Sequence, residues 1–249
     1  MIKPLIAGNW KMNGLRDAIA EAVAISKSVE KDKPRCDVLL CPPATLLPVL
    51  HEEIPNSVVA LGGQDCHAEA AGANTGDISA EMLKDAGASS VIIGHSERRG
   101  DHRETSTAVC SKVLAAHRAG LTAIVCIGET AGERRAGLTT SVVMRQLEAS
   151  LPESGTAGSV IVAYEPVWAI GTGLTPSSDD IAGIHASIRE TLKARFRDGD
   201  QFRILYGGSV KAKNAAELMA VDNVNGALVG GASLKAKDFL GIINYYKVG

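Results

Sequence analysis

A chain of 249 residues is long enough for one α/β barrel domain, and 45% hydrophobic with 22% charged residues is typical of a globular protein with a full core. The formal net charge of −2 excludes an extended positive field, so neither nucleic acid nor a membrane surface is expected as a partner. No apolar stretch approaches the roughly 20 residues that span a bilayer, and a strand-like run so close to the N-terminus predicts no signal peptide.

Short apolar runs recur along the chain, and many of them are rich in β-branched residues or Leu without regular alternation. This pattern is typical of parallel strands that are covered on both faces. The runs are 5–8, 36–41, 58–62, 90–93, 122–127, 160–164, 202–206 and 226–229.

The segments between these runs have a helical period. After the first run, an apolar stripe is formed by Leu15, Ile19, Ala22, Val23 and Ser26, and after the sixth by Ile181, Ile184, Ile188 and Leu192. The second stripe follows the hydroxyl and acidic side chains of 177–180, which predict a capped helix start.

Eight strand–helix units predict a parallel sheet that closes into a (β/α)8 barrel, with residues 1–249 as a single domain. A doubly wound open sheet is the alternative. The first turn, 8–14, lacks the G-x-G-x-x-G fingerprint of dinucleotide-binding open sheets, which favours the barrel.

One segment, 163–173, reads Ala-Tyr-Glu-Pro-Val-Trp-Ala-Ile-Gly-Thr-Gly. Glu165 ends the sixth apolar run, and Pro166 then fixes the backbone before a small, glycine-rich tip. A carboxylate at a strand end beneath a closing lid is suited to proton abstraction from carbon, because the lid excludes water from the base. The segment predicts an enzyme.

In a barrel, polar residues that follow the strands point into one shared mouth. Asn9 and Lys11 follow the first run, and His95 and Glu97 the fourth. A helix beginning after His95 would lower its pKa and leave a neutral imidazole as a hydrogen-bond donor. Glu97 is expected to support the site, although an ion pair with Arg98 is an alternative role.

Two glycine-rich turns, 206–210 and 228–234, follow the seventh and eighth runs, where barrel enzymes commonly bind phosphate through backbone N–H groups. Ser209, Gly230 and Gly231 are therefore candidate phosphate ligands, and Gly171 of the lid would supply a further donor.

No cofactor or metal is expected, since none of the six histidines has zinc-site spacing or a paired cysteine. The five cysteines form no C-x-x-C motif and lie mostly in apolar runs, which favours a reducing, cytoplasmic location.

Along its full length the chain resembles the triosephosphate isomerase family. The resemblance rests on 8–13 (GNWKMN), 94–99 (GHSERR), 125–129 (VCIGE), 163–173 (AYEPVWAIGTG), 206–210 (YGGSV) and 228–234 (LVGGASL). It implies a TIM barrel that interconverts dihydroxyacetone phosphate and D-glyceraldehyde 3-phosphate through an enediol(ate), in glycolysis and gluconeogenesis.

The resemblance also implies roles for individual residues. Glu165 would move the carbon-bound proton, and neutral His95 would polarise the carbonyl and shuttle a proton between the two oxygens. Lys11 would hold the negative charge and Asn9 would orient the substrate oxygens. The phosphate would be gripped by Gly171, Ser209, Gly230 and Gly231. These pairings of acid and base roles are well known for this family.

The segment 64–77 resembles the family's long third loop, which implies a homodimer in which Thr75 lies near the partner's site. The chain departs from the family's usual pattern at Asp65, where Asn is common, and at 174–176, where Pro176 is expected to alter lid kinetics. The alternative functions are a phosphate-anchored aldolase with a Schiff base on Lys11, and a non-catalytic phosphate-binding barrel.

Overall fold

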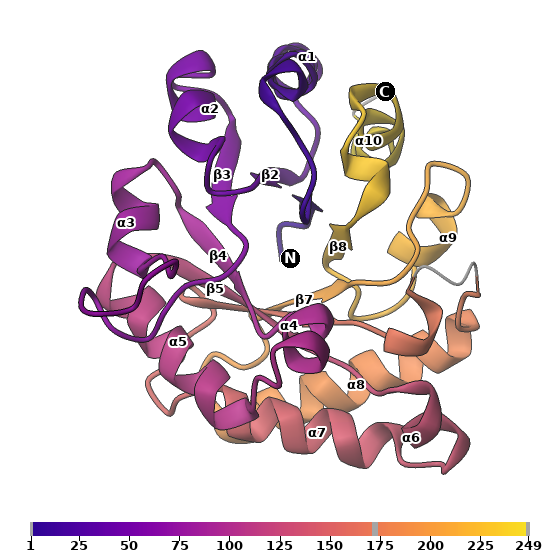
Figure 1. The fold of residues 1–249 in the computed structure, drawn as a ribbon. Helices are drawn as coiled ribbons and strands as arrows, with labels where there is room; N and C mark the ends of the chain where they lie inside the picture. Colours follow the sequence, from indigo (N-terminus) through magenta and orange to yellow (C-terminus); the bar gives the residue numbers. More distant parts are fainter. Residues whose placement is uncertain (1, 171–173, 248–249) are drawn as a thin grey trace.

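The strands form a closed, parallel barrel in the order β1 to β8 (Figure 1). The computed structural model describes residues 2–170 and 174–247. The strands are β1 Leu5–Asn9, β2 Asp37–Cys41, β3 Val59–Gly63, β4 Ser90–Ile93, β5 Thr122–Ile127, β6 Val160–Tyr164, β7 Arg203–Tyr206 and β8 Gly226–Val229. Each predicted strand is confirmed to within one residue at either end, and the open-sheet alternative is wrong because β1 also pairs with β8.

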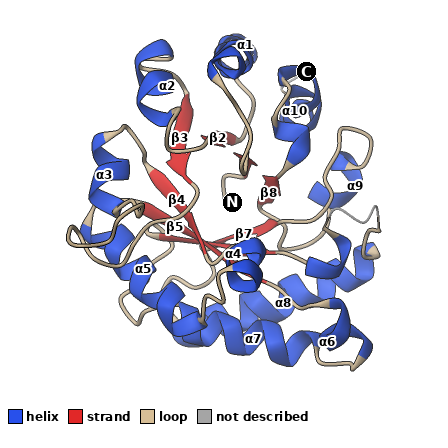
Figure 2. Ribbon diagram, in the orientation of Figure 1, coloured by secondary structure: helices blue, strands red, loops and turns tan. Residues whose placement is uncertain are grey.

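Helices surround the barrel as an outer layer (Figure 2). They are α1 Ile19–Asp32, α2 Leu47–Glu53, α3 Ala80–Asp85, α4 Ser96–Asp101, α5 Ser106–Arg118, α6 Ala131–Arg135, α7 Thr139–Ser150, α8 Ser178–Arg195, α9 Ala215–Met219 and α10 Ala236–Ile243. Short 3-10 turns are η1 Arg16–Ala18, η2 Val167–Ala169, η3 Gly231–Ser233 and η4 Asn244–Tyr246.

The predicted start of α8 is confirmed as a capping box. The Ser177 hydroxyl accepts from the Asp180 N–H at 3.1 Å, and the Asp180 carboxylate accepts from the Ser177 N–H at 3.3 Å. The predicted start of the first helix is wrong. Leu15 lies before η1 and its side chain is 79% exposed, because α1 begins only at Ile19.

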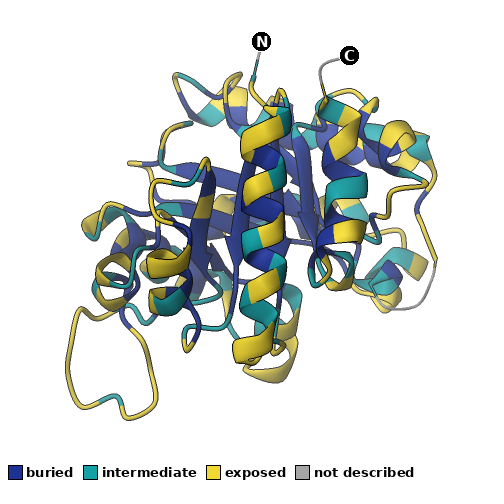
Figure 3. Cartoon of the chain, turned by 90° about the horizontal axis from the view of Figure 1, so that it is seen from above, coloured by how far each residue is buried: buried dark blue, intermediate teal, exposed yellow. Residues whose placement is uncertain are grey.

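The core has two parts, which follow from the two faces of the strands. One set of side chains, including Leu39, Ile92 and Leu205, fills the barrel interior. The other packs between the strands and the helices, and it includes Trp10, Phe202 and Phe239. The strands are accordingly buried while the outer faces of the helices are exposed (Figure 3).

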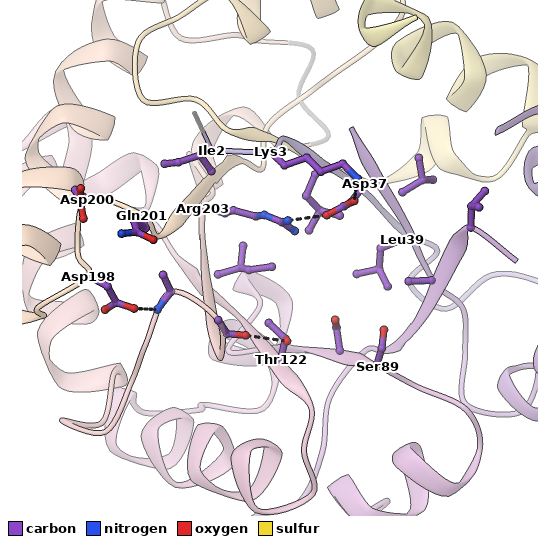
Figure 4. A pocket seen from close by; sticks show the side chains of 18 residues that line it. Ile2, Lys3, Asp37, Leu39, Ser89, Thr122, Asp198, Asp200, Gln201 and Arg203 are labelled. Carbon is purple, nitrogen blue, oxygen red and sulfur yellow. Dashed lines mark hydrogen bonds and ion pairs between the residues drawn. The ribbon is translucent and has the colours of Figure 1, made fainter. Parts of the chain in front are cut away.

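A cavity of about 1020 Å³ opens at the N-terminal ends of the strands (Figure 4). Asp37 accepts there from two cations, Lys3 Nζ at 2.6 Å and Arg203 Nη2 at 2.6 Å. These contacts join β2 and β7 to the segment that precedes β1, and both oxygens of the carboxylate are used. We therefore assign this end of the barrel to stability, as is general for the fold.

All five cysteines are free, and four of them are buried. None of the helices within the described residues combines the length and the apolar character needed to cross a bilayer.

His185 on α8 should make the protein less stable in acid. The ring is fully buried, Nδ1 lies 3.1 Å from the Asn223 carbonyl, and Nε2 has no partner among the described residues. Burial lowers the pKa of His185 to about 4 from the ordinary 6.5. The unfolded chain then binds the extra proton first, so stability falls as the pH drops from 6.5 towards 4.

We expect His185 to account for a loss of about 2 kcal/mol between pH 7.5 and pH 5. Urea unfolding at both pH values, for wild type and for His185→Gln, measures this loss. His185→Gln should have a lower free energy of unfolding than wild type at pH 7.5, but this free energy should fall less on acidification. An equal loss in both proteins would show that another group controls the acid sensitivity, and His102→Gln, an exposed histidine, is the matched control.

Candidate active site

The barrel mouth, where the polar residues that follow the strands were expected to meet, is a cavity of about 700 Å³ at the C-terminal ends of the strands. Its lining includes most of the residues expected from the sequence: Asn9, Lys11, His95, Glu165, Ser209, Gly230 and Gly231. Gly171 lies outside the described residues. The larger cavity at the opposite end of the barrel contains none of these side chains.

Glu165 follows β6 and is buried, with 2% of its surface exposed. Its N–H donates to the Ile127 carbonyl at 2.8 Å, which fixes the backbone against β5. The carboxylate lies 2.9 Å from His95 Nε2 and accepts from the Ser96 N–H at 3.0 Å. Burial alone would raise the pKa of Glu165, but His95 and the Ser96 N–H outweigh it and hold the pKa below its ordinary value.

His95 is the N-cap of α4, as expected from the sequence. Its Nδ1 accepts from the Glu97 N–H at 3.2 Å, so the proton of a neutral ring resides on Nε2 and faces Glu165. The predicted lowering of the His95 pKa is wrong for this arrangement. Burial is the largest single cause and lowers the pKa, but the contact with the Glu165 carboxylate and the nearby Glu97 together outweigh burial and raise it.

Lys11 has a left-handed backbone, with φ of 52°, which is unfavourable for a side chain other than glycine. Several contacts impose this conformation. The Lys11 N–H donates to Asn9 Oδ1 at 3.0 Å, and Gln64 Nε2 donates to the Lys11 carbonyl at 2.9 Å and to the Cys41 carbonyl at 2.8 Å. The sequence does not predict this role of Gln64, because nothing in its local pattern points to loop 9–11.

Glu97 forms an ion pair with Lys11, with Nζ and Oε1 2.6 Å apart. The alternative pairing with Arg98 is wrong. Arg98 instead contacts Glu104 and Asp65, each at 2.7 Å, and Lys112 completes the cluster by contacting the same two carboxylates. Asp65 is thus held between two cations at the root of segment 64–77.

The two glycine-rich turns meet beside Lys11. A β-carbon on Gly230 would lie 3.4 Å from the Lys11 Cε atom, so the lysine stem crosses this turn. The turns are held by side chains: Ser233 Oγ donates to the Gly230 carbonyl at 2.7 Å and Asn214 Nδ2 to the Ser209 carbonyl at 3.0 Å. Because these carbonyls are engaged, the turns can present backbone N–H groups to an anion.

Glu129 anchors residues on both sides of Glu165. Trp168 Nε1 donates to Glu129 Oε1 at 2.8 Å, and Tyr164 Oη donates to Glu129 Oε2 at 3.1 Å. The Arg134 guanidinium also stacks 4.1 Å from the centre of the Trp168 ring. Glu129 ends the motif 125–129, but nothing in the sequence predicts this contact.

The described residues contain no group of His, Cys, Asp or Glu side chains arranged to hold a metal ion. Lys11 lines the cavity and places a positive charge there.

Comparisons with known proteins agree with this geometry. A family model described as triosephosphate isomerase matches residues 4–246. The chain is 61% identical to a triosephosphate isomerase of Afipia carboxidovorans, covering 97% of this chain and 96% of that protein. It is 55% identical to one of Brucella abortus, covering 99% and 98%. The crystal structure of triosephosphate isomerase from Bartonella henselae superposes with a TM-score of 0.93 at 50% identity, covering 98% of this chain and 99% of that one.

Proposed function

Since the chain belongs to the triosephosphate isomerase family, we propose that Glu165, His95 and Lys11 carry out its reaction in the mouth of the barrel. The enzyme interconverts dihydroxyacetone phosphate and D-glyceraldehyde 3-phosphate, a step of glycolysis and gluconeogenesis. The observation that supports the assignment of residues best is the buried contact between Glu165 and His95, 2.9 Å apart, in a cavity that Lys11 also lines.

Glu165 is the base. A carboxylate is a suitable acceptor for a proton from the carbon next to a carbonyl, and its low pKa keeps it ionised at neutral pH. After the carbon–hydrogen bond breaks, its electron pair forms the carbon–carbon double bond of an enediolate. Glu165 then returns the proton to the neighbouring carbon, which completes the isomerisation.

His95 is the electrophile. Its Nε2–H faces Glu165 in the unliganded structure, so a bound substrate oxygen would take the place of the carboxylate as the acceptor. A neutral ring can donate this proton to one oxygen and recover a proton from the other. The Glu97 N–H, which donates to Nδ1, keeps the donor on the substrate side.

Lys11 supplies the positive charge of the site. It would stabilise both the phosphate and the enediolate, while Asn9 orients the substrate oxygens and Glu97 holds the ammonium group at 2.6 Å. The phosphate would bind at Ser209, Gly230 and Gly231, with Gly171 as the further donor. The lysine stem beside Gly230 supports this placement.

The direct test is to measure conversion of D-glyceraldehyde 3-phosphate to dihydroxyacetone phosphate by the purified protein. Rapid turnover without added cofactor is expected. A folded protein without turnover would contradict the proposal. A Schiff-base aldolase, the alternative enzyme, would leave the buried Glu165 without a role, and a non-catalytic barrel would not need Lys11, His95 and Glu165 together.

Residues 1–249 would act as one catalytic domain that assembles into a homodimer through segment 64–77. Thr75 in this segment is exposed. Two apolar residues are left in water by a lone chain: Met12, next to Lys11 in sequence, with 97% of its surface exposed, and Met82 of α3, which follows segment 64–77, with 53%. A second copy of the chain would cover them. The free cysteines support a cytoplasmic location for the enzyme.

Light scattering at micromolar concentration should therefore give twice the chain mass of 25.9 kDa. Thr75→Arg should shift the protein towards the monomer, because a buried contact would receive an unpaired charge. Thr140→Arg, on an exposed position of α7, is the matched control and should stay dimeric. A monomer mass for the wild type would overturn the proposed assembly.

A further inference from the structure

The backbone that carries Glu165 lies against residues 127–129, at the end of β5. The Glu165 N–H donates to the Ile127 carbonyl at 2.8 Å, and the Val167 N–H donates to the Glu129 carbonyl at 3.1 Å. Glu165 and the residue two positions after it are therefore both held by main-chain hydrogen bonds to this segment. The place of the base thus depends on where 127–129 lies.

Gly128, the middle residue of this segment, packs directly against Glu165. A β-carbon on Gly128 would overlap the Glu165 carbonyl oxygen and would lie 3.3 Å from the Glu165 Cα atom. The two backbones are closer than a side chain on residue 128 would allow. Because close-packed atoms transmit displacements to one another, a shift of the Gly128 peptide would also move the backbone of Glu165.

The side chain of Gln146, on α7, holds Gly128 with both ends of its amide. Gln146 Oε1 accepts from the Gly128 N–H at 2.8 Å, and Gln146 Nε2 donates to the Gly128 carbonyl at 3.1 Å. Only one orientation of the amide satisfies both backbone groups. The two hydrogen bonds together fix the position and the orientation of the Gly128 backbone.

Gln146 is a polar side chain on the face of α7 that packs against the barrel. The buried residues of this helix are Val142, Val143, Leu147 and Ser150. Gln146 follows the first two by four and three positions, so it shares their face. An apolar side chain would be sufficient for packing there, whereas an amide withdrawn from water needs hydrogen-bond partners. Both ends of the Gln146 amide find their partner on Gly128.

We infer that Gln146 is a positioning residue for the reaction, which fixes the backbone of the base Glu165 through Gly128. Hydrogen bonds join α7 to Gly128, and close packing joins Gly128 to Glu165. Proton transfer depends steeply on the placement of the carboxylate, and a misplacement of about 1 Å can cost roughly 10²-fold in rate. The inference rests on the proposed role of Glu165.

Gln146→Met tests the inference, because methionine has a similar length but no amide. We expect kcat to fall by roughly 10- to 100-fold. kcat/KM should fall by the same factor and KM should stay unchanged, since Lys11 and the glycine-rich turns that bind substrate are not altered. Inorganic phosphate should protect Gln146→Met against thermal unfolding as much as it protects wild type.

Two control variants separate positioning from stability. Leu147→Ala loosens the packing of the same helix but removes no side-chain hydrogen bond. It should lower the free energy of unfolding and keep the wild-type kcat at a temperature where the protein is folded. Gln201→Met makes the same chemical change at an exposed glutamine beside the opposite cavity, and it should match wild type in stability and in kcat.

A wild-type kcat in Gln146→Met would overturn the inference and leave Gln146 with a role in stability alone. An equal loss of kcat in Leu147→Ala would also overturn it, because any weakening of α7 would then have the same effect. If Gln146→Met does not fold, Gln146→Glu is the second variant. It can accept from the Gly128 N–H but places a carboxylate against the carbonyl, so it should lose kcat likewise. Failure of both to fold would assign the side chain to the fold alone and contradict the inference.

Glu165→Gln tests the proposed function separately. Full turnover by Glu165→Gln would contradict the assignment of the base, whatever Gln146→Met shows. A collapse of turnover in Glu165→Gln together with a wild-type kcat in Gln146→Met would retain the base and reject only the role of Gln146.

Discussion

Replacing Glu165 by Gln is expected to lower kcat by roughly 10²- to 10⁴-fold, the range that general-base catalysis contributes. The amide has almost the same volume as the carboxylate but cannot accept a proton from carbon. Substrate binding should change little, because Lys11 and the glycine-rich turns remain in place. The protein should fold, since an amide oxygen can still accept from His95 Nε2.

A modest loss of stability should accompany this change. The carboxylate accepts both from His95 and from the Ser96 N–H, and an amide can offer its oxygen to only one of them. The other donor is left unsatisfied, at a cost of about 1–3 kcal/mol. Thermal unfolding and a turnover assay on the same preparation separate the two effects. Glu190→Gln, an exposed glutamate on α8, is the control and should match wild type in both. Retention of a tenth or more of the wild-type kcat would remove Glu165 from the role of base.

The barrel was predictable because the strands are buried on both faces, so they stand out as uninterrupted apolar runs. The run 90–93 coincides with β4, and 122–127 with β5. The helix start at Leu15 was not predictable in the same way. Apolar spacing continues through 15–18, but the chain there forms a 3-10 turn that leaves Leu15 in water. Periodicity describes which side chains could share a face and does not say where a helix begins.

The positions of the candidate site residues were predictable for a related reason. Parallel strands end at one edge, so the residues after them converge, and Glu165 and His95 meet although 70 positions separate them along the chain. Their partners were not predictable. The contacts of Gln64 with Lys11 and of Gln146 with Gly128 depend on which segments are neighbours in the barrel and on side-chain length, neither of which leaves a local signal.

The absence of a local signal for contacts between distant segments also explains why the sequence predicted a lowered pKa for His95 although the pKa is raised. The helix that begins at Ser96 was expected from the sequence, and the positive end of a helix dipole opposes a positive charge on a neighbouring imidazole. The sequence did not show that the Glu165 carboxylate would contact the same ring in the unliganded protein. Charge contacts between distant segments decide such a pKa, and they become visible only in the folded chain.

Replacing Lys11 by Gly is expected to abolish most activity while leaving the fold intact. Lys11 adopts a φ of 52°, which glycine accepts without strain. Relief of that strain offsets the greater freedom of glycine in the unfolded chain, so stability should remain within about 1 kcal/mol of wild type. Loss of the ammonium group removes the cation that the phosphate and enediolate need, and kcat/KM should fall by roughly 10³-fold or more.

The chain offers a matched control for this experiment in Lys33, which also has a left-handed backbone, with φ of 46°, at the exposed end of α1. Lys33→Gly makes the same chemical change in the same backbone conformation, but far from the cavity lining. It should keep wild-type turnover and gain a little stability as a favourable helix C-cap. Inorganic phosphate should protect wild type and Lys33→Gly against thermal unfolding, and should protect Lys11→Gly much less. Equal protection and turnover in all three proteins would mean that Lys11 holds neither phosphate nor enediolate, and that its unfavourable backbone conformation has another cause.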